Sequence, residues 1–136
     1  MKVLFVCIGN ACRSPMAEGL FNFESEKNNN HDKAKSAGVK PYTHVIDGSV
    51  EIMRELGINI TNHKPKGVTQ DLLNWADKII LLDGSIEEDF INLPSSNKEK
   101  IIVWDIKDPY MTSKENFRRM RNLIHEKILE FLNERT

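Results

Sequence analysis

The residues best suited to chemistry stand near the start of the chain. Cys7 and Arg13 are separated by five residues in the stretch C-I-G-N-A-C-R-S, which directly follows an apolar run at residues 3–6. A cysteine thiolate is a nucleophile, and a guanidinium presents a planar fork of donors that matches two oxygens of a tetrahedral oxyanion. Packing is the alternative explanation: a small apolar thiol at a strand end and a surface arginine. The spacing C-x5-R on its own also occurs by chance, so the surrounding residues must decide.

The residues between Cys7 and Arg13 favour an anion-binding loop. Gly9 allows backbone conformations that are closed to other residues, so successive N–H groups can point into one concavity. Ser14-Pro15 is typical of a helix start with Ser14 as the cap, and a helix N-terminus directs free N–H groups toward the same place. Arg13 and these donors favour the thiolate form of Cys7, to which Ser14 can donate a further hydrogen bond. We therefore expect Cys7 to be a nucleophile toward phosphorus. The phosphate-binding loop around it is expected to consist of Ile8, Gly9, Asn10, Ala11, Cys12 and Ser14.

Short apolar runs and stretches of helical periodicity alternate along the chain, which predicts buried strands separated by covering helices. Strands are expected at residues 2–6, 33–36, 78–83 and 101–104, and helices at 14–26, 47–56, 70–75, 85–92 and 113–131. Asp47 or Ser49 is expected to cap the second helix. This order is typical of an α/β protein with a four-stranded parallel sheet covered on both faces, here as a single domain over residues 1–136. Ligands of such sheets bind beyond the carboxyl ends of the strands, and Cys7, Asp83 and Asp108 are all expected at that edge.

Composition narrows the classes of function. The chain has 136 residues, a net charge of −1 and two cysteines, so its bulk charge gives no reason to expect nucleic acid or an anionic membrane as a partner. The apolar run near the N-terminus is too short for a signal peptide and no stretch is long enough to span a bilayer, so we expect a cytoplasmic protein. The four histidines show no paired spacing, so we expect no metal and no other cofactor. We also expect a monomer, and a solvated basic face formed by Arg118, Arg119 and Arg121.

Several motifs together carry a resemblance to a known family. C-I-G-N-A-C-R-S-P-M-A-E, placed directly after the first strand, resembles the signature of the low-molecular-weight protein tyrosine phosphatases. The resemblance continues through S-A-G at 36–38, G-I-N-I-T-N-H at 57–63, L-L-D-G-S at 81–85 and D-P-Y at 108–110. It implies a three-layer, Rossmann-like or flavodoxin-like fold and the hydrolysis of aryl phosphate monoesters through a phosphocysteine intermediate. The expected substrates are tyrosine-phosphorylated proteins or other aryl phosphates.

The resemblance also implies roles beyond the loop. Asp108 is expected to protonate the departing phenolate, a role that suits a carboxyl group in a stiff Asp-Pro turn beyond a strand end; Asp105 is the local competitor. Tyr110 is expected to wall the pocket. The loop at residues 39–44 departs from the family, whose members often have a tryptophan there, and Tyr42 either takes its place or is simply exposed.

Four residues in or near the loop have further expected roles. Asn10 and His63 match family positions that brace the phosphate loop through hydrogen bonds. Asp83 either anchors the loop or the neighbouring helix, or it simply caps a strand end. Cys12 is either a packed residue or the partner of Cys7 in a reversible disulfide that protects the nucleophile from irreversible oxidation.

Two other functions fit the same loop. An arsenate reductase of the same superfamily would use the loop on arsenate, but its thioredoxin-linked form relays a disulfide through further cysteines, and this chain has none after Cys12. The stretch at residues 63–66, H-K-P-K, is similar to that branch, so a relay through an external thiol stays open. The second alternative is a non-catalytic oxyanion or phosphopeptide binder. The joint presence of Cys7, Arg13 and Asp108 argues against it, because a binder needs neither a thiol nor an acid.

Overall fold

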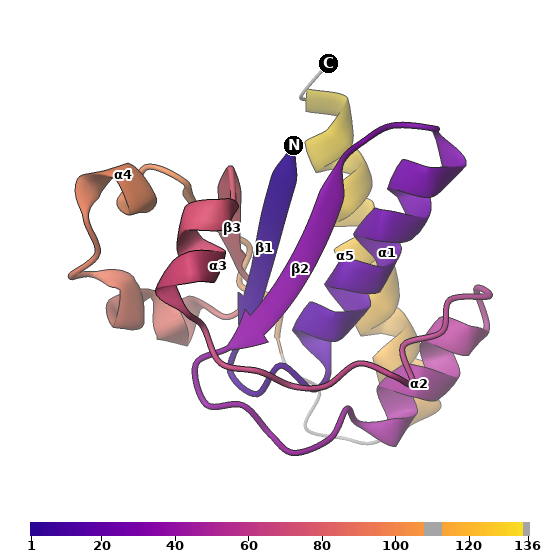
Figure 1. Ribbon diagram of the computed structural model, residues 1–136. Helices are drawn as coiled ribbons and strands as arrows, with labels where there is room; N and C mark the ends of the chain where they lie inside the picture. Colours follow the sequence, from indigo (N-terminus) through magenta and orange to yellow (C-terminus); the bar gives the residue numbers. More distant parts are fainter. Residues whose placement is uncertain (108–112, 135–136) are drawn as a thin grey trace.

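A parallel β-sheet forms the centre of the molecule (Figure 1). The computed structural model describes residues 1–107 and 113–134, and within them the sheet has four strands in the spatial order β2-β1-β3-β4. The strands are β1 (Lys2–Cys7), β2 (Lys33–Gly38), β3 (Lys78–Leu81) and β4 (Ile101–Val103). This is the flavodoxin-like order, in which ligands bind where the chain changes direction across the sheet, beside the carboxyl ends of β1 and β3. The expected α/β class and parallel sheet are confirmed.

Helices cover both faces of the sheet, as expected (Figure 1). One face carries α1 (Arg13–Lys27), α2 (Asp47–Arg54) and α5 (Lys114–Glu134). Toward the other face lie α3 (Gln70–Trp75), the 3-10 helix η1 (Gly84–Phe90) and the short α4 (Ser95–Lys98), of which the sequence did not predict the last. None of the helices in the described part of the chain is long and apolar enough to cross a membrane.

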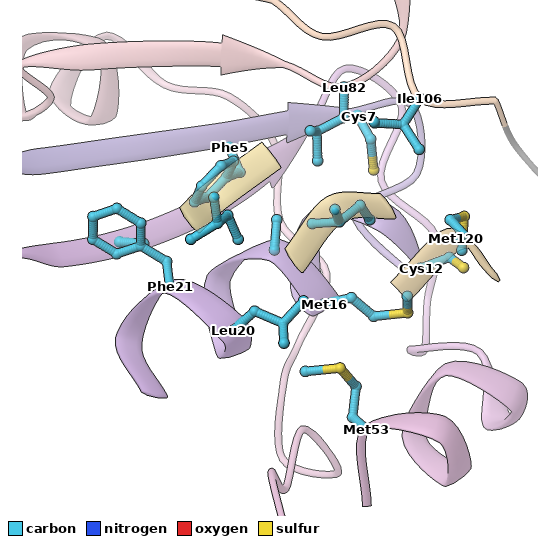
Figure 2. Packing of buried hydrophobic residues seen from close by; sticks show 14 of the residues in the cluster. Phe5, Cys7, Cys12, Met16, Leu20, Phe21, Met53, Leu82, Ile106 and Met120 are labelled. Carbon is cyan, nitrogen blue, oxygen red and sulfur yellow. The ribbon is translucent and has the colours of Figure 1, made fainter. Parts of the chain in front are cut away.

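The apolar character of β1 follows from its position between these two helical layers. Its alternate side chains enter different cores: Phe5 and Cys7 join the core under α1 and α5, whereas Leu4 and Val6 join the core under α3 and η1. A strand buried on both faces has to be apolar at every position. Figure 2 shows Phe5 facing Phe21 of α1, and the ring centroids of these two residues lie 5.9 Å apart in an edge-to-face arrangement.

The helix starts differ from the expected ones. α1 begins at Arg13 with Cys12 as its N-cap residue, and no side chain caps it, so the expectation that Ser14 caps the helix is wrong. α2 has Ile46 as its N-cap residue, so neither Asp47 nor Ser49 caps it. The two serine hydroxyls contact cysteine sulfurs instead, Ser14 that of Cys7 and Ser49 that of Cys12, and Asp47 is already the first residue of α2.

The basic cluster on α5 is not simply a solvated face. Arg118 and Arg121 both bind Glu55, which directly follows α2, and Arg121 also donates to the carbonyl of Ile52. The hydrogen bonds from Arg118 and Arg121 lower the pKa of Glu55 to about 2. Only Arg119 follows the expectation, since it is exposed and pairs with Glu115 on its own helix. The two paired arginines therefore fasten α5 to α2, which follows the loop at 39–46.

Candidate active site

A small cavity lies at the carboxyl end of β1, where the strand passes into the loop before α1. It has a volume of about 50 Å³. The structure thus brings the expected nucleophile and the expected oxyanion-binding arginine to one cavity, together with much of the expected loop. Its lining residues are Cys7, Ile8, Gly9, Ala11, Cys12, Arg13, Tyr42 and Ile46.

Asn10 lies behind this cavity and holds the loop in shape. It is fully buried, and its backbone has a φ of 51°, a left-handed conformation that asparagine tolerates better than most residues. Its side-chain nitrogen donates to Ser14 Oγ at 2.7 Å and to Ser36 Oγ at 3.0 Å. Its side-chain oxygen accepts from the Lys66 backbone N–H at 3.0 Å. The amide therefore fixes the positions of two hydroxyl groups, and one of them, Ser14 Oγ, contacts the Cys7 sulfur.

Ser14 connects Asn10 to the sulfur of Cys7. Ser14 Oγ lies 3.0 Å from Cys7 Sγ, and both side chains are buried. Because the hydroxyl oxygen already accepts from Asn10, its hydrogen is available for the sulfur. The hydroxyl is therefore placed to donate to the Cys7 sulfur. α1 starts at Arg13, so the N-terminal end of this helix directly follows the loop.

His63 contacts the loop from outside. Its Nε2 lies 3.1 Å from Asn10 Oδ1 and 3.3 Å from the Asn10 carbonyl oxygen. Both partners are acceptors, so the ring nitrogen is the donor. Burial lowers the pKa of His63, and the charge of Lys66 adds to this effect, against a smaller opposing influence of Glu18 and the Asn10 carbonyl. The neutral ring can serve this bracing role because one N–H is sufficient.

Arg13 is anchored at the ends of two neighbouring strands. It is 3% exposed, and its Nη1 donates to Asp83 Oδ2 at 2.9 Å and to the Ile106 carbonyl at 2.8 Å. Burial alone would raise the pKa of Asp83, but hydrogen bonds from Ser85 and the pairing with Arg13 outweigh it and leave the pKa below its usual value. The structure places Asp83 as the partner of Arg13, the first residue of α1, and as the N-cap residue of η1, because its side chain also accepts from the Ser85 N–H.

The sulfur of Cys12 and the sulfur of Cys7 contact different side chains. Its sulfur accepts a hydrogen bond from Ser49 Oγ of α2 at 3.0 Å. Both cysteines are buried, no disulfide joins them, and both line the cavity. A disulfide between them stays a prediction.

Among the described residues, no group of three or more His, Cys, Asp or Glu side chains is arranged to hold a metal ion.

Tyr42 covers the loop at Gly9. Its side chain is exposed, but a Cβ added to Gly9 would lie 2.6 Å from its ring, so the ring sits directly on the loop backbone.

The expected positions of Asp108 and Tyr110 lie outside the described residues. Asp105, the competitor for the acid, adopts a φ of 47° and accepts a hydrogen bond from the Gly84 N–H at 2.8 Å.

The family to which the chain belongs follows from a comparison with known proteins. The model of the low molecular weight phosphotyrosine protein phosphatase family matches residues 2–135. The chain belongs to this family.

The solved structures and curated proteins similar to this chain carry different names. A low molecular weight protein tyrosine phosphatase from T. tengcongensis is 31% identical and covers 98% of this chain and 99% of its own, with a TM-score of 0.91. Wzb from Vibrio vulnificus, solved in complex with benzylphosphonate, is 25% identical over 98% of this chain and 97% of its own, with a TM-score of 0.84. Arsenate reductase 2 of Staphylococcus saprophyticus is 32% identical over 130 residues, which span 95% of this chain and 94% of that protein.

Sequence reasoning missed part of the phosphatase-family site. Ser36 accepts from Asn10 and donates to Glu18 Oε1 at 2.7 Å, which extends the buried network to α1. Gly38 lies so close to the loop that an added Cβ would come within 2.7 Å of the Ile8 carbonyl oxygen. Ser49 holds Cys12. The S-A-G motif did contain Ser36 and Gly38, but serine and glycine at a strand end have too many ordinary roles to reveal these contacts.

Proposed function

We propose that this protein is a cysteine-dependent phosphatase that hydrolyses aryl phosphate monoesters, with phosphotyrosine in proteins as its substrate. One observation carries the proposal. The Cys7 sulfur lies 3.0 Å from a hydroxyl whose oxygen already accepts another hydrogen bond, in a cavity that the sulfur shares with Arg13. A group that donates to sulfur beside a buried guanidinium suits a thiolate facing an oxyanion.

The proposed reaction has two steps. In the first, Cys7 Sγ attacks phosphorus, an S–P bond forms and the bond from phosphorus to the aryl oxygen breaks. Arg13 and the loop N–H groups hold the non-bridging oxygens, whose charge they stabilise. In the second step water attacks phosphorus, the S–P bond breaks, and phosphate leaves with Cys7 again a thiolate.

Asp108 supplies and recovers the proton in this scheme. As an acid it protonates the aryl oxygen as that oxygen leaves, and as a base it takes a proton from the attacking water. The support is the D-P-Y motif and its place shortly after β4, since Ile106 of the same segment accepts a hydrogen bond from Arg13.

Kinetics on two substrates test the proposal. The wild type should hydrolyse both phosphotyrosine and p-nitrophenyl phosphate, and Cys7→Ser should abolish turnover of both. Asp108→Asn should lose about 10²- to 10⁴-fold in kcat on phosphotyrosine, but less on p-nitrophenyl phosphate, whose leaving group needs less protonation. Asp105→Asn is the matched control. Equal losses of Asp108→Asn on the two substrates would remove it as the acid, and phosphate binding without any turnover would favour the non-catalytic binder.

Arsenate reduction is the second candidate, and the curated relatives favour it. Proteins named arsenate reductase are 32% and 33% identical to this chain over 95% of its length. Reduction of arsenate to arsenite takes two electrons, which two thiols supply by forming one disulfide. The chain has only Cys7 and Cys12, so no further cysteine can relay a disulfide away from them. An external thiol would therefore have to reduce the protein directly after each cycle.

The two candidates differ in what they consume. Phosphatase activity consumes an aryl phosphate and no thiol, whereas arsenate reduction consumes two thiols for each arsenate. The assay measures oxidation of glutathione or thioredoxin with and without arsenate, beside release of p-nitrophenol. If the protein oxidises thiols with arsenate faster than it hydrolyses the aryl phosphate, arsenate reduction becomes the favoured function.

A further inference from the structure

A large open groove lies beside the catalytic cavity. It has a volume of about 1340 Å³ and runs between the loop at residues 43–46, α2 and the segment at residues 61–65. Ile46 lines both the groove and the catalytic cavity, so the two spaces meet at this residue. His63, which braces the catalytic loop through Asn10, forms part of the opposite wall.

The groove has an apolar floor and a polar rim. The half-buried residues Val45, Ile46, Val50 and Pro65 supply apolar surface along its length. Exposed polar and charged side chains surround them. These are Thr43, His44, Asp47, Glu51, Arg54, Thr61, Asn62 and Lys64. An apolar centre with a polar, hydrated border is the usual anatomy of a surface that binds polypeptide.

The sizes of the two spaces indicate what the groove accommodates. The catalytic cavity, at about 50 Å³, holds a few water molecules or one phosphoryl group. The remainder of any larger substrate therefore lies outside it, on the surrounding surface. The groove is larger than the pockets of about 300–1,000 Å³ that enclose small ligands. A free oxyanion would make no use of it, whereas a protein segment would.

The charges of the rim are available to a partner. Within the described residues, Glu51 pairs with Lys114 at 3.8 Å, but no ion pair engages Asp47, Arg54 or Lys64. These three leave a net charge of +1 on the unpaired part of the rim. This positive charge therefore favours the binding of a polypeptide segment with acidic side chains.

We propose that this groove binds the polypeptide beside the phosphorylated residue of a protein substrate. An apolar side chain of the substrate lies over Val45, Val50 and Pro65, and an acidic side chain meets Arg54 or Lys64. This inference rests on the proposed function, because the phosphorylated residue must occupy the catalytic cavity at the same time. It assigns specificity to residues outside the catalytic loop.

Charge reversal on the rim separates peptide binding from chemistry. The substrates are p-nitrophenyl phosphate and two phosphotyrosine peptides of equal length, one with acidic and one with lysine residues around the tyrosine. In Arg54→Glu/Lys64→Glu, kcat/KM on the acidic peptide should fall about tenfold, and kcat/KM on p-nitrophenyl phosphate should stay within about twofold. The lysine peptide should lose less than the acidic one, or gain. Lys33→Glu, at the amino end of β2, is the matched control and should change none of these values.

Val50→Ser tests the apolar floor, and Leu129→Ser at an exposed site of α5 is its control. Because Val50 packs against the core, the thermal stability of both variants is measured as well. Val50→Ser should lower kcat/KM only for peptides with an apolar residue near the phosphotyrosine. Equal losses on peptides and on p-nitrophenyl phosphate, or no loss on peptides, would overturn the groove proposal while leaving the phosphatase intact. If the wild type turns over neither kind of substrate, the proposed function fails and this inference fails with it.

Discussion

At the scale of single residues, Asn10 explains most of the order in the catalytic loop. Its amide donates to Ser14 and Ser36 and accepts from His63 and the Lys66 backbone. Aspartate has the same shape but no N–H to donate, so it could not orient the two hydroxyls. Asparagine also tolerates the left-handed backbone at this position. One residue type thus meets a steric demand and four hydrogen-bonding demands at the same time.

The hydroxyl of Ser14 should determine how readily Cys7 reacts. Ser14→Ala removes the hydrogen bond to sulfur and leaves one Asn10 donor without its partner. We expect kcat on p-nitrophenyl phosphate to fall about tenfold, which is the effect of about 1.4 kcal/mol, and alkylation of Cys7 by iodoacetamide at neutral pH to slow in parallel. Ser96→Ala, at an exposed site of α4, is the control. Unchanged alkylation in Ser14→Ala would show that the hydroxyl does not act on the thiolate.

Burial of His63 should make stability depend on pH. Its pKa is lowered in the folded protein, so the unfolded chain binds more protons and the free energy of unfolding decreases as the pH falls through the ordinary histidine pKa of about 6.5. His63→Gln keeps a side chain that can donate to Asn10 but cannot titrate. Urea unfolding on both sides of this pH should therefore show a smaller acid-induced loss of stability in His63→Gln than in the wild type. Parallel pH profiles for the two proteins would contradict this account.

How far the site could be predicted depends on the type of residue. Cys7 and Arg13 could be found because the strand before them, Gly9 between them and the Ser14-Pro15 helix start after them together favour an anion-binding loop. Ser36 and Glu18 could not, because their hydrogen bonds to the loop network arise only when β2 and α1 come together. The contact of Arg13 with Ile106 joins residues 93 apart in sequence, which no local pattern indicates.

At the scale of elements, the strands were predicted better than the ends of the helices. β1 and β3 are continuous apolar runs because both faces are covered, and this signal is local. Helix caps were inferred from serine and aspartate before an apolar pattern, a rule that assumes the hydroxyl is free to bind backbone N–H groups. Ser14 and Ser49 instead bind sulfur. The rule therefore failed where the chain uses its hydroxyls for the site.

The close approach of β2 to the catalytic loop gives a prediction for Gly38. A methyl group there would lie 2.7 Å from the Ile8 carbonyl oxygen and 2.8 Å from the Asn10 nitrogen, so Gly38→Ala must displace the loop backbone. We expect kcat to fall by tenfold or more and stability to fall by about 1–3 kcal/mol. Gly57→Ala is the matched control: its φ is 75° with open space around it, so it should lose about 1 kcal/mol of stability with unchanged kcat. Equal kcat values for the two variants would contradict the role of Gly38.

At the scale of the whole molecule, the strand order β2-β1-β3-β4 places the catalytic loop, which follows β1, where the other three strands can also support it. The loop follows β1, and the β2 residue Gly38 lies against it. Arg13 reaches across to Asp83 beyond β3 and to the Ile106 carbonyl beyond β4. The anion site is therefore joined to every strand of the sheet in the described structure. An anion bound there should stabilise the entire fold rather than the loop alone.

Thermal unfolding in phosphate measures this coupling. A ligand that binds only the folded chain raises the free energy of unfolding by about 1.4 kcal/mol for each tenfold rise in concentration above its dissociation constant. We expect the wild type and Cys7→Ser to follow this dependence in a single transition, because the anion contacts Arg13 and loop N–H groups in both. Arg13→Lys keeps the charge but loses the planar fork, so its phosphate-dependent shift should be much smaller. Chloride at equal ionic strength is the control for screening. An equal shift in chloride, or in Arg13→Lys, would mean that phosphate does not bind in the cavity between Cys7 and Arg13.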